Sequence, residues 1–434
     1  MTPELFGGLG LAVLLGLLAL GVPIGAALIV VGAGGMALLV SPEAALIKSG
    51  VVAFETLSRY ELGVLPLFLL MAHLCFSAGA SRDFFAAASR FVGHKPGGLA
   101  VASIAACAGF GSISGSSLAT AATVGAVALP EMRKQGYSPA LATGALAAGG
   151  TLGSLVPPSG ALIVFGIIAE QSISKLFVAS LIPAATQAIF YIIAIVIMCK
   201  INPALGPASA RAGWRARGQA LLQVWDLAVL ILLVIGGLAI GWFTPTEAAS
   251  VGCVGAAALC VWRRKLTRAS LVKAFSDTLR TTGMIYTVII GALIFSTFIS
   301  LSGLTTELSS AVAGLHSGRV IGLIAMAAAL LVLGSFLDGM ALMLLTTPIF
   351  LPIAVTLGVS PIWFGIFLVR TMEIGFVHPP VGMNVYVIHG LAKDIPLTTI
   401  FKGIVPFLVT DFLHLGLLIA VPSLTLFLPS ILAH

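Results

Sequence analysis

The sequence predicts an all-α integral membrane protein built as an inverted repeat of two five-span units. Three observations support this prediction: an apolar composition, two apolar stretches divided by Gly/Ser-rich turns, and prolines that recur after 222 residues. Of the 434 residues, 59% are hydrophobic and 9% are charged, and the mean hydropathy is +1.14. A soluble domain is about 25% charged, so the composition excludes a soluble enzyme, a nucleic-acid-binding protein and a disordered linker.

Ten apolar stretches are long enough for a spanning helix, which needs about 20 residues. They lie at about residues 4–21, 23–40, 62–79, 139–170, 174–199, 222–242, 245–262, 284–301, 361–392 and 402–429. The more polar segments 41–61 and 263–283 are expected to form helices along the membrane surface. The five cysteines lie in apolar segments without metal-ligand spacing, so we interpret them as small buried hydrophobic residues.

Two further stretches, residues 97–130 and 319–352, each contain two apolar runs of about 15 residues. Each run reaches about 22 Å at the rise of an α-helix, less than the hydrocarbon thickness of about 30 Å. The turns between the runs, at 111–117 and 334–339, are rich in Gly and polar residues, which are costly when they face lipid. We therefore predict two re-entrant hairpins with buried tips. The alternative is a pair of short spans joined by a surface loop.

The basic residues indicate the orientation, because cytoplasmic loops of membrane proteins are enriched in Lys and Arg. With the N-terminus outside and each hairpin returning to its own side, 17 of the 22 Lys and Arg residues fall in cytoplasmic loops and four fall outside. The remaining one, Arg370, lies within a span. This asymmetry predicts a periplasmic N-terminus.

A shift of 222 residues reveals the internal repeat. It places five of the twelve prolines in the first half on prolines of the second half, where chance would give about 0.6. The pairs are Pro23 with Pro245, Pro130 with Pro352, Pro139 with Pro361, and Pro157-Pro158 with Pro379-Pro380. We place the first copy at residues 1–221 and the second at residues 222–434. Because each copy has an odd number of spans, the second copy is expected to be upside down.

Each copy contains a helix broken by two consecutive prolines, within residues 139–170 and 361–392. Proline removes a backbone donor and clashes with the preceding turn, so two in a row unwind a helix and free carbonyl oxygens. Such carbonyls, together with Ser and Thr hydroxyls, suit a small cation such as Na⁺, and broken helices in inverted repeats form the central sites of secondary transporters. We therefore predict an ion or substrate site at the breaks. The alternative is a pair of packing kinks without ligands.

Candidate ligands come from the hairpin tips and the breaks. For an anionic substrate, we expect contacts from Ser114, Gly115, Ser116, Ser117, Thr151, Ser159 and Asn384. For Na⁺, we expect ligands from Ser112, Ser114, Gly153, Pro157, Gly334, Asp338, Gly375 and Pro379. An intramembrane carboxylate such as Asp338 is costly and is usually functional. The alternative for Asp338 and for the tip serines is helix capping.

Three charged residues are assigned structural or gating roles. Glu247 is expected to close a capping box with Thr244. Arg370 and Glu373 lie three residues apart on one helix and are expected to pair, as a gate or a lock. Asp411 in the last span has no assigned role, and a partner subunit is one candidate for what it faces.

The chain resembles, over nearly its whole length, the large membrane (permease) subunit of tripartite ATP-independent periplasmic (TRAP) transporters. The resemblance is carried by the segments GSISGSSLAT at 111–120, LPEM at 129–132, VPPS at 156–159, TPTEAA at 244–249, DG at 338–339, MEIG at 372–375 and PPVGMN at 379–384. It implies an elevator-type, Na⁺-coupled importer in the bacterial cytoplasmic (inner) membrane. It also implies two partners, a small membrane subunit of about four helices and a periplasmic solute-binding protein that delivers an organic acid (a carboxylate).

Two positions depart from the pattern of this family. Thr120 stands where relatives often carry Asp, and His378 stands where Thr is commoner, so a ligand role at either position is in doubt. A self-sufficient Na⁺-coupled carboxylate symporter is the alternative function, and an intramembrane enzyme is a remote one. We expect no catalytic residues and no use of ATP, because the sequence lacks a His-Glu-x-x-His pattern and a Gly-x-x-x-x-Gly-Lys-Ser/Thr loop.

Overall fold

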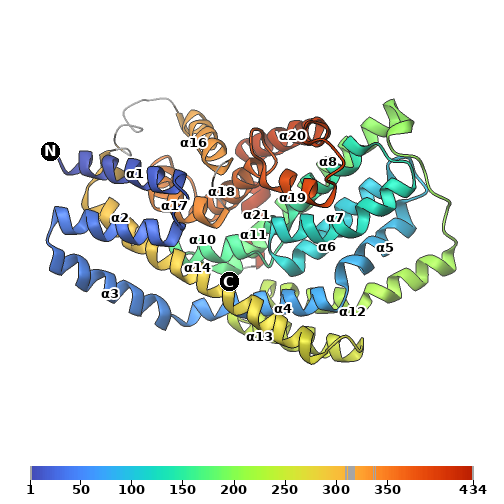
Figure 1. The fold of residues 1–434 in the computed structure, drawn as a ribbon, viewed down its shortest axis with the longest axis horizontal. Helices are drawn as coiled ribbons and strands as arrows, with labels where there is room; N and C mark the ends of the chain where they lie inside the picture. The colour runs from blue at the N-terminus through green and yellow to red at the C-terminus, as the bar shows by residue number, and fades with distance from the viewer. Residues whose placement is uncertain (1, 308–309, 311–317, 336, 338, 433–434) are drawn as a thin grey trace.

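The computed structural model describes residues 2–307, 310, 318–335, 337 and 339–432, and this part of the chain is helical throughout, without strands (Figure 1). Asp338 lies outside the described residues. The first half contains α1 (Pro3–Ala19), α2 (Ile24–Leu39), α3 (Pro42–Ser58), η1 (Tyr60–Gly63), α4 (Val64–Ser77), α5 (Ala80–Val92), α6 (Gly98–Ser114), α7 (Ser117–Lys134), α8 (Pro139–Gly150), α9 (Leu152–Leu155), α10 (Gly160–Ile168), α11 (Ile173–Ile201) and η2 (Pro203–Leu205). The second half contains α12 (Trp214–Ala239), α13 (Pro245–Trp262), α14 (Arg268–Leu301), α16 (Gly318–Gly334), α17 (Gly339–Thr356), α18 (Pro361–Gly375), α19 (Met383–Leu391), α20 (Leu397–Ala420) and α21 (Ser423–Leu432).

Seven helices of the described chain are long and apolar enough to cross a membrane, and the bent pair formed by α8–α9 and α10 is an eighth candidate. Seven of the ten expected spans meet this test when the bent pair is counted as one span. The stretches 4–21 and 23–40 do not, because α1 and α2 have only 17 and 16 residues. The stretch 361–392 does not, because it is divided into α18 and α19. The remaining qualifying helix is α17, an arm of the second hairpin.

The two hairpins have longer arms than expected. The second arms, α7 and α17, have 18 residues each and continue past Pro130 and Pro352. A proline inside a helix removes one hydrogen bond, and here the flanking turns hold the helix together across that loss. At about 27 Å, each of these arms nearly matches the hydrocarbon thickness. Their re-entrant course therefore stays a prediction that rests on the polar tips.

The order of helices repeats after 222 residues. The shift places the first and last residues of α7 on the first and last residues of α17. It also places the first residue of α8 on the first residue of α18. The two copies differ where α3, η1 and α4 correspond to the single helix α14 of 34 residues, and at their ends, where α21 follows α20 but only η2 follows α11. Pro66 lies in the first turn of α4 and requires a helix start there, whereas its counterpart Val288 does not. The segment 263–283 is thus largely continuous with the third span of its copy, and its place along the membrane surface stays a prediction.

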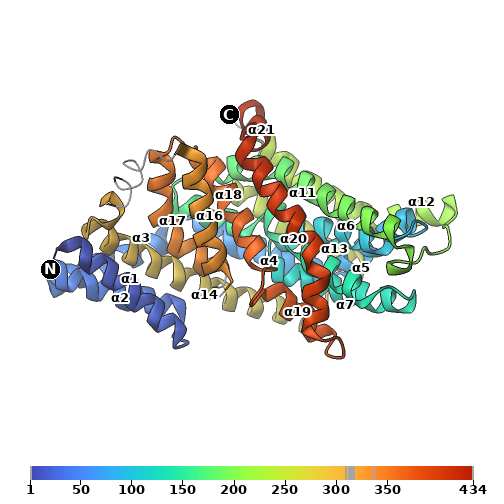
Figure 2. The same ribbon diagram turned by 90° about the horizontal axis from the view of Figure 1, so that it is seen from above.

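The helices form two bodies, which we call the frame and the bundle. The frame consists of α1–α4 and α12–α14, in which α14 packs on α2, α3 and α4, and α13 packs on α4 and α12. The bundle consists of α6–α11 and α16–α21, in which α8 packs on α6, α7 and α20 (Figures 1 and 2). The helix α5 packs on both α6 of the bundle and α12 of the frame. The last expected span, 402–429, is interrupted because Pro422 follows α20 and a new helix, α21, begins after it.

Candidate functional site

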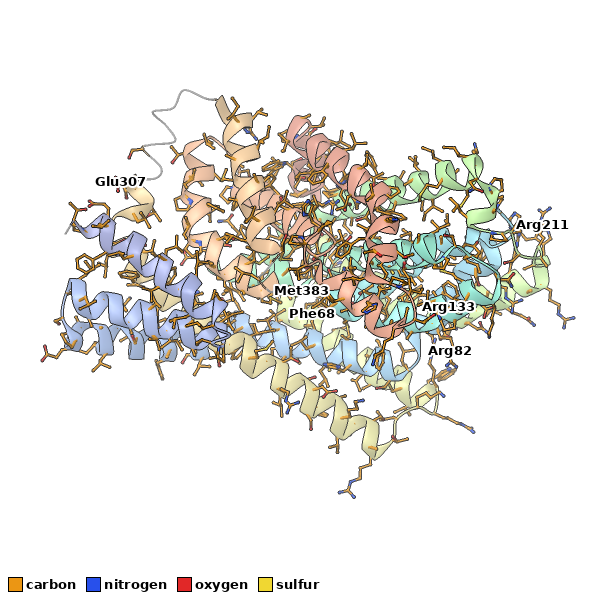
Figure 3. The ribbon with its side chains drawn as sticks, turned by 45° about the horizontal axis from the view of Figure 1, so that its top comes forward. Phe68, Arg82, Arg133, Arg211, Glu307 and Met383 are labelled. Carbon is orange, nitrogen blue, oxygen red and sulfur yellow. The ribbon has the colours of Figure 1, made fainter. Side chains whose placement is uncertain are left out.

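A cavity of about 590 Å³ lies between the frame and the tip of the first hairpin. One wall is formed by α4 and α14, including Phe68, His73 and Lys273. The other wall is formed by the hairpin tip and by Pro158 and Gly160 at the break. Figure 3 labels Phe68 near the middle of the molecule. The volume is in the range of small-molecule sites, which are mostly apolar with a few polar groups.

The tip of the first hairpin supplies three of the expected substrate residues to this cavity, Ser114, Gly115 and Ser116. Gly115 ends α6 at φ +59°, a left-handed conformation that favours glycine. Ser116 is the N-cap of α7 and accepts a hydrogen bond from the Ala119 N–H at 3.4 Å. The Ser114 hydroxyl lies 2.7 Å from the Thr120 hydroxyl, so the departure from the family pattern at Thr120 helps to hold the tip.

The first break meets this tip directly. The Gly160 N–H donates to the Gly115 carbonyl at 3.3 Å. Ser159 is the N-cap of α10, accepting from the Leu162 N–H at 3.2 Å, and its hydroxyl donates to the Ser154 carbonyl. The N-termini of α7 and α10 therefore lie side by side at the cavity. Helix N-termini carry a partial positive charge and unpaired N–H groups, which favour an anion.

The other expected substrate residues have different surroundings. Ser117, Thr151, Ser159 and Asn384 are buried and do not line the cavity. The Thr151 hydroxyl donates to the Ala148 carbonyl at 2.6 Å and lies 2.9 Å from the Tyr191 hydroxyl. The Asn384 side-chain N–H donates to the Ala147 carbonyl at 3.1 Å, which ties α19 to α8. Thr151 and Asn384 therefore link neighbouring helices, while the Asn384 side-chain oxygen is buried without a partner among the described residues.

The expected Na⁺ residues fall at close helix contacts in both copies. A Cβ on Gly153 would lie 2.5 Å from the Ser116 carbonyl oxygen, and a Cβ on Gly375 would lie 3.0 Å from the Gly334 carbonyl carbon. Each break thus packs directly on a hairpin. Because Pro157 and Pro379 have no N–H, the Gly153 and Gly375 carbonyls four residues earlier lose their helical donors.

The other Na⁺ candidates among the described residues are Ser112 and the first proline of each break. The Ser112 hydroxyl turns back into its own helix and donates its hydrogen to the Gly109 carbonyl at 2.7 Å. The Pro157-Pro158 and Pro379-Pro380 peptide bonds are both cis.

Arg370 and Glu373 do not pair with each other, contrary to the expectation. The Arg370 side chain forms an ion pair with Asp411 at 2.5 Å and donates from Nε to His414 Nδ1 at 3.2 Å. Glu373 accepts a hydrogen bond from the Ser117 hydroxyl at 2.5 Å, and Ser117 also bonds with Ser154. All of these side chains are buried. If Arg370 paired with Glu373, the buried Asp411 carboxylate would be left without a cation, which is strongly destabilising.

Asp411 faces the inside of the bundle and not a partner subunit. Besides Arg370, it accepts hydrogen bonds from the Gln187 side chain at 2.8 Å and from the Tyr191 hydroxyl at 2.6 Å. Since Tyr191 also contacts Thr151, this network runs from α20 through α11 to the first break. Sequence reasoning assigned no role to Tyr191 or Gln187, because no motif marks them.

Glu247 forms the expected capping box with Thr244 at the start of α13. Its carboxylate accepts from the Thr244 N–H at 2.9 Å, while the Glu247 N–H donates to the Thr244 hydroxyl at 3.3 Å. Both residues lie away from the cavity, so their role is structural. Sequence reasoning missed Lys273 and Asp277, which line the cavity from α14.

Comparison with known proteins gives consistent matches over nearly the whole chain. The family model described as "Tripartite ATP-independent periplasmic transporter, DctM component" matches residues 11–424. The chain is 34% identical over 398 residues to the C4-dicarboxylate TRAP transporter large permease protein DctM of Pseudomonas aeruginosa, covering 91% of each. It is 32% identical to the sialic acid TRAP transporter large permease protein SiaM of Vibrio cholerae, covering 96% of this chain and 97% of that relative.

Two further matches bear on architecture. The isethionate TRAP transporter permease protein DctMQ of Oleidesulfovibrio alaskensis is 30% identical, and the match covers 99% of this chain but 65% of that relative. Among solved structures, the YdaH transporter of Alcanivorax borkumensis has a similar fold, with a TM-score of 0.62 at 15% identity, covering 88% of this chain and 89% of that one. This likeness confirms the expected class of fold, an all-helical membrane protein.

Proposed function

Since this chain belongs to the DctM component family of tripartite ATP-independent periplasmic transporters, we propose that it carries an organic acid across the bacterial inner membrane, driven by Na⁺. It is the large permease of such a system, and its relatives are named as transporter permeases. The single observation that supports the proposed cargo most strongly is the cavity where the N-termini of α7 and α10 meet.

An organic acid suits this cavity for two reasons. The N–H groups and partial positive charges at two helix N-termini stabilise a carboxylate without a buried cationic side chain. Lys273 on the opposite wall adds a positive charge from the frame, and Asp277 on the same wall offsets part of it. The named cargoes of the relatives, C4-dicarboxylates and sialic acid, are also acids.

Na⁺ coupling is supported by the two breaks. In each copy, a glycine whose carbonyl loses its helical donor to a proline packs its Cα closely against a hairpin. Backbone carbonyls of unwound helices are the usual ligands of Na⁺ in secondary transporters. We propose that Gly153 and Gly375 contribute their carbonyls, and that Asp338 contributes the charge of the second site.

An elevator mechanism is supported by the position of the cavity between the frame and the bundle. A bundle that slides against the frame would carry the hairpin tips and breaks with it, so the cargo would change sides without a full opening of the protein. We propose two partners, a periplasmic solute-binding protein and a small membrane subunit. The relative named DctMQ extends well beyond the part that matches this chain, which is consistent with a further fused component.

The experiment that tests this proposal is uptake of a labelled C4-dicarboxylate or sialic acid into proteoliposomes that contain the chain, the small membrane subunit and the loaded binding protein. Ser116→Leu places a large side chain at the cavity, and we expect a fall in uptake of at least about tenfold. The matched control is Ser172→Leu, because Ser172 is also a helix N-cap but lies away from the cavity. Equal uptake by the two variants would contradict the assignment of the cavity.

A further inference from the structure

Within the described part of the chain, Arg217 is a buried cation without an anionic partner. It lies in the first turn of α12, is 8% exposed, and its Nε and Nη2 atoms have no hydrogen-bond acceptor among the described residues. The nearest acid along α12, Asp226, is engaged by Arg263 at 2.6 Å. A buried, unpaired guanidinium is strongly destabilising, so an acceptor from outside the described residues would stabilise it.

Two other buried polar atoms without a partner lie on segments near Arg217. The Arg217 guanidinium lies 5.8 Å from the centre of the Phe91 ring, and His94 follows Phe91 by three residues, just past the end of α5. Ser209 is held beside His94, because its N–H donates to the Gly93 carbonyl at 2.8 Å. His94 Nδ1 and the Ser209 hydroxyl are also buried without a partner in the described part of the chain. Guanidinium, imidazole and hydroxyl groups together form a donor set that suits phosphate oxygens.

The surroundings favour a lipid over a free anion. The helix α12 is a candidate membrane span, so Arg217 lies close to the end of an apolar segment, where phospholipid headgroups are found. Leu221 and Leu222, one turn further along, are 53% and 70% exposed and offer a surface for acyl chains. Trp214 is 78% exposed and stacks 5.1 Å from the guanidinium, as aromatic residues do at the membrane interface.

The net charge of the region selects an anionic lipid. Lys95, Arg211 and Arg215 lie next to the site in sequence and are exposed. Figure 3 labels Arg211 at the same end of the molecule as Arg82 and Arg133, away from Glu307. Clusters of basic residues beside a membrane span attract anionic lipids. We propose that Arg217, with Ser209 and His94, binds the phosphate of an anionic phospholipid at the start of α12.

The test compares two charge-removing variants of the purified full chain. Arg217→Gln and the control Arg215→Gln each remove one positive charge, but only Arg217 is buried at the site. Each protein is incubated in micelles with equal phosphatidylglycerol and phosphatidylcholine, and the retained lipid is counted by native mass spectrometry. We expect Arg217→Gln to lose about fivefold of the retained phosphatidylglycerol, and Arg215→Gln, which removes only one charge of the surrounding basic cluster, to lose much less. Ser209→Ala should show a smaller loss, which keeps the test open if Arg217→Gln does not fold.

Three outcomes would overturn the proposal. Equal losses in Arg217→Gln and Arg215→Gln would show only general attraction to a basic surface. Thermal stabilisation of the wild type by inorganic phosphate that equals the effect of phosphatidylglycerol would identify a free-anion site. Unchanged lipid retention together with loss of the complex with the small membrane subunit in Arg217→Gln would assign the residue to a protein interface. None of these readouts depends on transport, so the result is independent of the proposed cargo and coupling ion.

Discussion

The buried carboxylate of Asp411 accepts hydrogen bonds from three side chains, those of Arg370, Gln187 and Tyr191. Both members of the ion pair are at most 1% exposed. Burying two charges is costly, and such a pair contributes mainly by fixing one arrangement of the helices that carry it. Here it joins α18 to α20 and, through Tyr191, reaches Thr151 at the first break. The residue that sequence reasoning left unexplained is therefore the centre of the bundle's polar network.

Breaking this pair should destabilise the bundle. Asp411→Asn leaves the Arg370 guanidinium buried without a counter-charge, and we expect a loss of about 3–5 kcal/mol in the free energy of unfolding. The measurement is thermal unfolding of the purified protein in detergent, followed by intrinsic fluorescence. The double variant Arg370→Met/Asp411→Leu should recover part of the loss, because it removes both charges. An unfolding temperature of Asp411→Asn equal to that of the wild type would show that the pair does not carry this role.

At the scale of elements, the contact between the hairpin and the break of each copy depends on a glycine in the break. Gly153 approaches the tip of the first hairpin so closely that a methyl group has no space, and Gly375 stands in the same relation to α16. A helix break and a hairpin can share a cation only if their backbones come this near. The close contacts at Gly153 and Gly375 therefore link the packing of each break on its hairpin to the proposed Na⁺ sites.

A single methyl group should separate the first hairpin from the first break. In Gly153→Ala, the new Cβ would lie 2.5 Å from both the Ser116 carbonyl oxygen and the Thr120 hydroxyl oxygen, so the tip must move. We expect uptake in proteoliposomes to fall by at least about tenfold, because small displacements of binding groups are costly to function. The control is Gly236→Ala in α12, where a Cβ meets nothing within 4 Å. If Gly153→Ala and Gly236→Ala transport equally well, close approach at the break is not required.

The elements that could be predicted from sequence are those marked by proline. Pro139, Pro245 and Pro361 begin α8, α13 and α18, and the two Pro-Pro pairs mark the breaks, because a missing N–H acts on the local backbone whatever surrounds it. The partner of Arg370 could not be predicted in this way, since Asp411 comes from a helix 41 residues away. The exposure of Lys273 to the cavity likewise depends on how α14 packs against the bundle. Local chemistry therefore predicted the first hairpin tip and the two helix breaks. It did not predict the polar network around Asp411 or the cavity wall that the frame provides.

At the scale of the whole molecule, the frame and the bundle meet at the cavity that holds the proposed cargo site. The bundle carries both hairpins and both breaks, so the proposed sites for cargo and Na⁺ belong to one body (Figure 2). Coupling then requires that Na⁺ and the acid stabilise the same arrangement of hairpin and break. If binding of one favours binding of the other, the gradient of Na⁺ drives uptake of the acid.

The most direct test of this account is the dependence of uptake on Na⁺ in proteoliposomes that contain the chain, the small membrane subunit and the loaded binding protein. With an inward Na⁺ gradient we predict accumulation of the acid above its external concentration. Replacement of external Na⁺ by K⁺ should abolish accumulation, and Asp338→Asn should sharply reduce it in a protein that still folds. Accumulation that persists in K⁺, or that follows a proton gradient without Na⁺, would contradict the central claim.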